Sequence, residues 1–102
     1  MTSAGGFVQI VEVTSAPRAE IEPLVEGWLR ATEGRRTARR GTLTEDRDRP
    51  GTFLQIVEFD SYEDAMANGE LPETTEFAAK LAALCDGEPA FRNLEVRRVD
   101  QM

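Results

Sequence analysis

Histidine is absent from this 102-residue sequence, and cysteine occurs only once, at Cys85. Without histidine the chain cannot build a Ser-His-Asp or Cys-His catalytic centre, a proximal-histidine haem site or most zinc sites. A single cysteine excludes an internal disulfide, an iron–sulfur cluster and a cysteine-based zinc site. Only carboxylates remain as strong metal ligands, so we expect no bound metal and no cofactor.

Long apolar runs are also lacking. No stretch approaches the ~18 residues that a membrane helix needs. The first residues have neither the basic region nor the apolar region of a secretory signal. The net charge of −7 disfavours generic binding to nucleic acid or to an anionic membrane. We therefore expect a cytoplasmic protein that binds neither nucleic acid nor membrane.

The composition that is present is typical of a globular domain. Apolar residues make up 40% of the chain and charged residues 30%. The length corresponds to one domain, residues 1–102, with a core over roughly residues 6–99.

Apolar patterning predicts the element order β-α-β-β-α-β, with the second helix broken into two pieces. Apolar residues from Ile21 to Leu29 recur at helical spacing. Pro23 belongs in a first helical turn, so we expect this helix to begin near Glu20. Ser61 is predicted to cap the next helix, which ends at 68–69, and Pro72 to open the last one. The expected strands are residues 7–13, 35–45, 52–59 and 91–99, and the expected turns are 14–18 and 46–51.

Two strand sequences are nearly the same. Residues 7–13 read FVQIVEV and residues 53–59 read FLQIVEF, with five of seven positions identical. Either two buried strands converged on similar composition, or two β-α-β halves use equivalent central strands. The second explanation places the first and third strands side by side and parallel. It would pair Gln9 with Gln55, and Glu12 with Glu58. Both explanations predict central strands.

Both faces of these central strands are mostly apolar, whereas the helices can cover only one face of the sheet. An open apolar face favours a second copy, sheet against sheet. The small aliphatic residues Val8 and Ile10 suit packing against helices. An unpaired buried amide costs about 1–3 kcal/mol, so we expect Gln9 and Gln55 to face the partner. The fold class predicted is α+β, a ferredoxin-like protomer whose four-stranded, antiparallel-type sheet carries helices on one face, within a homodimeric α/β barrel.

The sequence resembles the dimeric α/β-barrel superfamily, which includes antibiotic-biosynthesis monooxygenase-like proteins. The resemblance is carried by FVQIVEV, the helix through Trp28, FLQIVEF, and SYEDAMANGELPET leading into FAAKLAALC. It implies two ferredoxin-like protomers whose sheets form a barrel, with a pocket between sheet and helices or inside the barrel.

The superfamily includes cofactor-independent oxygenases, polyketide cyclases, lactone isomerases and haem-degrading enzymes. The haem-degrading members use an Asn, Trp and His set, which a chain without histidine does not match. The cofactor-free oxygenases use Asn, Trp, Tyr and Arg. Asn68, Tyr62 and several arginines are present here but fit no matching motif. We expect a cofactor-independent monooxygenase or cyclase that acts on a small aromatic or polyketide-type molecule. The alternatives are a non-catalytic small-molecule-binding protein and a structural dimer with a filled cavity.

Candidate site residues follow from the predicted barrel. Gln9 and Gln55 are predicted to bind a ligand, or else to hydrogen-bond each other as structural groups. Glu12 and Glu58, towards the carboxyl ends of their strands, are the catalytic candidates as general bases, or else solvated charges paired with arginines. Tyr62 is a ligand-binding candidate at the pocket mouth. Trp28 and Cys85 are expected to be core residues, although Trp28 stacking on a ligand is the alternative.

Residues 35–49 concentrate positive charge, with six arginines against three carboxylates in an otherwise acidic chain. We place this segment on an edge strand, where charge blunts edge-to-edge aggregation. The alternative is recognition of an anionic substrate or of an acyl-carrier partner.

Overall fold

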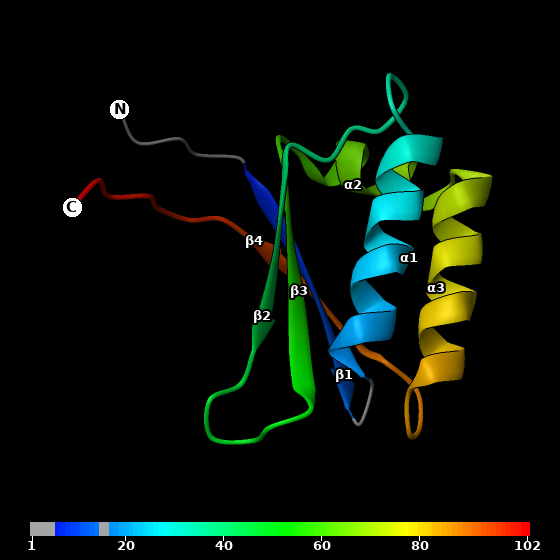
Figure 1. Ribbon diagram of the computed structural model, residues 1–102. Helices are drawn as coiled ribbons and strands as arrows, with labels where there is room; N and C mark the ends of the chain where they lie inside the picture. Colours follow the sequence, from blue (N-terminus) through cyan, green and yellow to red (C-terminus); the bar gives the residue numbers. More distant parts are fainter. Residues whose placement is uncertain (1–5, 15–16) are drawn as a thin grey trace.

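The computed structural model describes residues 6–14 and 17–102. Its four-stranded antiparallel sheet has the order β2-β3-β1-β4, and three helices lie on one side of it (Figure 1). The predicted ferredoxin-like α+β fold is confirmed, including the break between α2 and α3. The elements are β1 Phe7–Thr14, α1 Arg18–Ala31, β2 Arg40–Glu45, β3 Thr52–Phe59, α2 Tyr62–Gly69, α3 Pro72–Leu84 and β4 Ala90–Glu95.

The two similar strand sequences are adjacent, but they run antiparallel, so the parallel pairing is wrong. Gln9 lies opposite Val57, and Val11 lies opposite Gln55. The connections explain the direction. The helical crossover makes β1 and β2 parallel, and a short turn makes β3 antiparallel to β2. Because β3 lies between them, it is antiparallel to β1 as well.

The helices cover the face that carries the glutamines, so the predicted face assignment is also wrong. On this face Val11, Val13 and Phe53 pack against Ile21 of α1 and Leu81 of α3. Val8, Ile10, Leu54 and Ile56 alternate to the other, helix-free face.

Aromatic burial accounts for this choice. Phe7, Phe53 and Phe59 are 4%, 3% and 1% exposed, and all three lie on the helix side. Burying each such side chain stabilises the fold by roughly 1.5–3 kcal/mol. Together the three outweigh the cost of two central amides, which is about 1–3 kcal/mol each.

Three element boundaries differ from expectation. Helix α1 begins at Arg18 rather than near Glu20, with Pro17 at its N-cap, so Pro23 lies beyond the first turn. Strand β2 begins only at Arg40 because residues 32–36 form a turn that binds back to the helix end. Strand β4 ends at Glu95, which is the last residue paired with β1.

Two expectations fall partly on residues that the structure does not describe. The predicted turn at 14–18 includes positions 15 and 16, and the expectation of no secretory signal concerns positions 1–5; both sets of positions lie outside the described residues. Among the residues that are described, no helix is long and apolar enough to span a bilayer. Within the same part of the chain, no three His, Cys, Asp or Glu side chains are grouped to hold a metal ion.

Candidate ligand cavity

A small cavity of about 90 Å³ lies between the sheet and the helices, and we call it the amide chamber. Its floor comes from β1 and β3 with Phe91 of β4, and its roof comes from α1 and α3 with Asn68 of α2. The apolar walls include Val11, Val57, Val25, Trp28, Phe77 and Leu81. The polar lining includes three carboxamide side chains: Gln9, Gln55 and Asn68. An apolar chamber with a few converging polar groups is the usual form of a small-molecule site.

The three carboxamides differ in how their hydrogen-bonding groups are used. The Gln9 Nε2 group donates to Asn93 Oδ1 across β1 and β4, at 3.1 Å. By contrast, Gln55 Oε1 and Asn68 Oδ1 are buried and accept no hydrogen bond. Asn68 is only 6% exposed. An unsatisfied buried acceptor costs about 1–3 kcal/mol, and a ligand that carries hydrogen-bond donors would remove that cost.

The position of Gln55 depends on a glycine in the neighbouring strand. A Cβ atom at Gly41 would lie 3.1 Å from Gln55 Nε2, which is tighter than an ordinary contact. The missing side chain on β2 therefore leaves room for the Gln55 carboxamide.

Trp28 forms one wall of the chamber and also joins the two helices of the roof. Its indole Nε1 donates to Thr74 Oγ1 of α3 at 2.9 Å, and its ring lies 6.2 Å from that of Phe77. The indole is only half-buried, and it lines the cavity as well as packing. Both of the roles considered for Trp28, packing and contact with a ligand, are therefore open to it.

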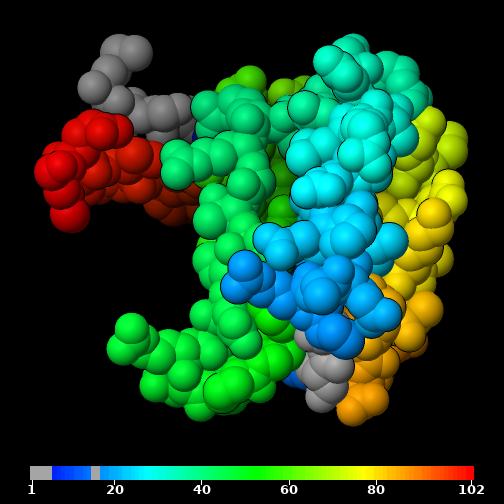
Figure 2. Space-filling model, viewed as in Figure 1, coloured from blue at the N-terminus to red at the C-terminus, as the bar shows by residue number. Residues whose placement is uncertain are grey.

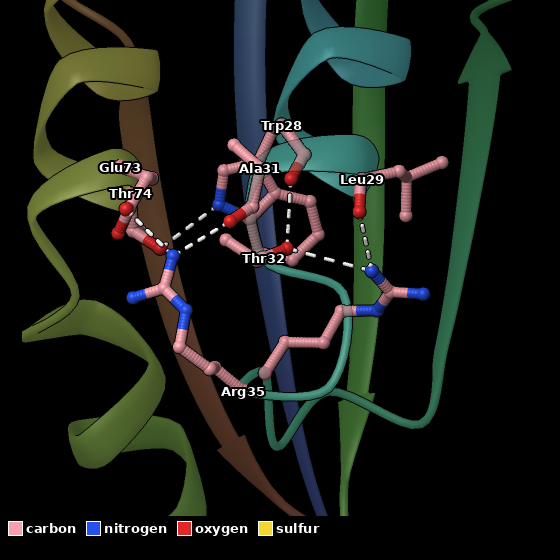
Figure 3. A network of polar contacts seen from close by, with 8 residues as sticks. Trp28, Leu29, Ala31, Thr32, Arg35, Glu73 and Thr74 are labelled. Atoms are coloured by element: carbon pink, nitrogen blue, oxygen red, sulfur yellow. Dashed lines mark hydrogen bonds and ion pairs between the residues drawn. The ribbon is translucent and has the colours of Figure 1, made fainter.

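A polar contact holds α3 against the end of α1. Arg35 Nη2 donates to the Ala31 carbonyl and to Glu73 Oε2, both at 2.6 Å (Figure 3). The hydrogen bond from Arg35 holds the pKa of Glu73 below its usual value. The buried Thr32 hydroxyl donates to the Trp28 carbonyl at 2.7 Å and closes the same helix end. These contacts set the spacing of the helices over the chamber.

The acidic candidates lie apart from the chamber. Glu12 and Glu58 are on the helix-free face, where Arg92 and Arg40 pair with them at 3.4 and 3.5 Å. They sit at opposite ends of the antiparallel ladder, separated by four residue pairs or about 13 Å. The expectation that they lie side by side is wrong.

Tyr62 is not among the residues that line the chamber. Its ring packs edge-on against Phe7, with the centroids 5.5 Å apart, and the residue is 52% exposed. Cys85 is a core-packed thiol whose Sγ donates to the Leu81 carbonyl at 3.0 Å. Burial raises the pKa of the Cys85 thiol, and this disfavours a nucleophilic role.

Asn68 is the site residue that sequence reasoning missed. It was interpreted as part of a helix stop and as an asparagine that fits no oxygenase motif, and α2 does end at the next residue. One signal was available: Asn68 follows Ala65 at helical spacing on the buried side of α2. A polar residue on the apolar side of a short helix indicates either a structural hydrogen bond or a site.

Solved structures share this fold over nearly the whole chain. SnoaB, a cofactor-independent oxygenase from Streptomyces nogalater, matches with a TM-score of 0.76 and 16% identity, over 94% of this chain and 97% of its own. A candidate antibiotic biosynthesis monooxygenase from Caulobacter crescentus CB15 matches with a TM-score of 0.76 and 14% identity, over 92% of each chain. A conserved protein from Methanosarcina mazei Go1 matches with a TM-score of 0.78 and 10% identity, over 91% of this chain and 94% of its own.

These matches define the structural class of the chain. No protein-family profile and no curated protein matches the sequence. At identities of 10–16%, the structural likeness establishes the fold. The resemblance to antibiotic-biosynthesis monooxygenase-like proteins is thereby confirmed at the level of the ferredoxin-like fold.

Proposed function

We propose that this protein binds a small hydroxylated aromatic molecule in the amide chamber and oxidises it with molecular oxygen, without a cofactor. The observation that carries the proposal is the pair of unsatisfied, buried carboxamide oxygens on Gln55 and Asn68, two residues that line an apolar chamber. Phenolic hydroxyls would donate to these oxygens while the ring contacts the apolar walls. The likeness to SnoaB, described as a cofactor-independent oxygenase, supports the reaction type.

The proposed reaction converts a ring methylene into a carbonyl. One atom of O₂ enters the product, and the other leaves as water with the two methylene hydrogens. Amide N–H groups of the chamber would stabilise the enolate that reacts with oxygen. No carboxylate is among the residues that line the chamber, so we expect substrates acidic enough to lose their proton to water.

The same absence of a lining carboxylate favours a second candidate function, which is binding without catalysis. An oxygen electrode separates the two, with 8-hydroxy-2-tetralone as the probe, a two-ring phenol that carries a ring methylene beside its carbonyl. We expect oxygen uptake above the spontaneous rate in the wild type and its loss in Gln55→Leu. If the probe binds under argon but uptake stays at the spontaneous rate, the protein is a binding protein. If it does not bind at all, both candidates fail for this probe class.

We also propose that the protein is a homodimer formed through the helix-free face of the sheet. The face carries aliphatic residues of β1 and β3 together with Leu94 of β4, which is 43% exposed. Figure 2 shows this side of the molecule hollowed between the C-terminal segment and the β2–β3 turn. The glutamates on the face are paired with arginines, so a second copy would not bury an isolated charge.

Several expectations remain predictions within this proposal. A catalytic role for Glu12 or Glu58 requires a substrate inside the dimer interface rather than in the amide chamber. A ligand contact by Tyr62 requires a ligand that reaches beyond the chamber lining. The cytoplasm remains the compartment we expect.

A further inference from the structure

A second cavity of about 160 Å³ adjoins the amide chamber, and we call it the arginine mouth. The two cavities share the lining residues Val25, Trp28, Gln55 and Val57. The mouth is distinguished by three basic residues, Arg36, Arg39 and Arg40. One elongated molecule could therefore contact both the carboxamides and the guanidinium groups.

Only one of these three arginines lacks an acidic partner among the described residues. Arg39 is paired with Asp60 at 3.1 Å, and Arg40 with Glu58 at 3.5 Å. Within the same part of the chain, no carboxylate forms an ion pair with Arg36, which is half-buried. The positive charge of Arg36 is therefore available at the mouth.

The Arg36 guanidinium is also held in place. Its Nη1 group donates to the Leu29 carbonyl at 2.8 Å and to Thr32 Oγ1 at 3.4 Å, both at the end of α1. Its Cζ atom lies 5.9 Å from the centroid of the Trp28 ring. A guanidinium has five N–H donors, so this anchoring leaves donors for a ligand. A fixed planar cation beside an aromatic wall is suited to a carboxylate attached to an aromatic ring.

We propose that the ligand of this cavity is an aromatic carboxylate, with its ring extending from the amide chamber into the arginine mouth and its carboxylate at Arg36. This inference rests on the proposed function, because it assumes that the chamber binds an aromatic molecule. The overall charge of −7 repels anions, so a local cation is needed to select one. An engineered apolar cavity of about 150 Å³ binds benzene, so the two adjoining cavities suit a ligand of one or two rings.

The test compares a carboxylate with its neutral amide. Calorimetry would measure binding of 2-naphthoate and 2-naphthamide, and of benzoate and benzamide as the one-ring pair. Side-chain amide resonances of ¹⁵N-labelled protein would report whether each probe enters the chamber. The variants are R36Q and R36K, and R47Q serves as the matched control because it removes one exposed arginine from the β2–β3 turn. Thermal unfolding would show whether each variant remains folded.

We expect the wild type to prefer the carboxylates. R36Q should weaken carboxylate binding roughly tenfold, the size expected for one charge-assisted interaction. It should leave the neutral amides unchanged. R36K keeps the charge but loses the planar guanidinium, so we expect its affinity for the carboxylates to fall several-fold. This variant replaces R36Q in the test if R36Q is unstable. R47Q should bind all four probes as the wild type does.

Other outcomes overturn the inference in distinguishable ways. Equal binding of carboxylate and amide, or an equal loss in R36Q and R47Q, would leave the chamber as an aromatic site without anion recognition. Lower thermal stability of R36Q with an unchanged carboxylate preference would reduce Arg36 to a structural group at the helix end. If no probe shifts the side-chain amide resonances, the proposed function fails together with this inference.

Discussion

The two faces of the single sheet solve different packing problems with similar residues. On the covered face, three phenylalanines fill the ends, while Gln9 and Gln55 lie where the helices leave a chamber. On the helix-free face, small aliphatic residues lie between two glutamate–arginine pairs. The covered face, which encloses a cavity, thus has its polar groups at the centre. The helix-free face, which is proposed to form the dimer interface, has its polar groups at the periphery. In this sheet the central amides lie at the cavity rather than on the helix-free face.

The largest expected effect concerns the helix-free face. Ile10→Asp would place an unpaired carboxylate in the proposed interface, so we expect dissociation constants to rise more than a hundredfold, about 3 kcal/mol or more. Light scattering should then report the monomer mass of 11.3 kDa instead of twice that value. Met66→Asp, on exposed α2, is the matched control and should remain dimeric. A wild-type monomer of normal stability would contradict the proposed interface.

The next effect concerns the roof of the covered face. Trp28→Ala should lower the free energy of unfolding by about 3–5 kcal/mol, because it leaves a void between α1 and α3. Trp28→Phe retains most of the packing and loses the bond to Thr74, so about 1 kcal/mol is expected. Chemical denaturation measures both values. Trp28→Ala with wild-type stability and lost ligand binding would make Trp28 a site residue rather than a structural one.

The two glutamines of the covered face are expected to differ, although their strand sequences match. Gln55→Leu removes an unsatisfied oxygen, so we expect unchanged stability or a gain of about 1 kcal/mol. Gln9→Leu breaks the bond to Asn93 and should cost about 0.5–1 kcal/mol. The double variant should keep the dimer and lose probe binding. Denaturation that ranks the two single variants in the opposite order would contradict this comparison.

The smallest effect concerns the contact between Arg35 and Glu73. Because the pKa of Glu73 is lowered in the folded protein, the unfolded chain binds the proton more readily. The contribution of the pair is therefore complete above the ordinary glutamate pKa and is lost as the pH falls through the lowered value. In Glu73→Gln, the free energy of unfolding should therefore fall less steeply with decreasing pH over this acidic range, the acid limb of its pH dependence. Glu26→Gln, on exposed α1, is the control and should leave the limb unchanged.

Sequence patterning predicted most elements because their signals are local. The β-branched run at 52–59 and the Ser61 cap lie where they were expected, and Ser61 Oγ accepts from the Asp64 N–H at 3.1 Å. The arginine-rich segment was less predictable. Arg35 and Arg36 bind the carbonyls at the end of α1 instead of extending β2, because unsatisfied helix-end carbonyls attract guanidinium donors. That competition depends on where the helix ends in space.

By itself the sequence determined the element order, the two central strands and the exclusion of histidine-dependent chemistry. Only the tertiary structure decided which strand face meets the helices. Strand alternation divides the residues between two faces, and because both faces are apolar it does not show which one is covered. It also decided that β1 and β3 run antiparallel, because direction follows from the crossover and the hairpin rather than from strand composition. The candidate site depends on both decisions. The meeting of Gln55 from β3, Asn68 from α2 and Trp28 from α1 is a long-range arrangement that no local pattern specifies.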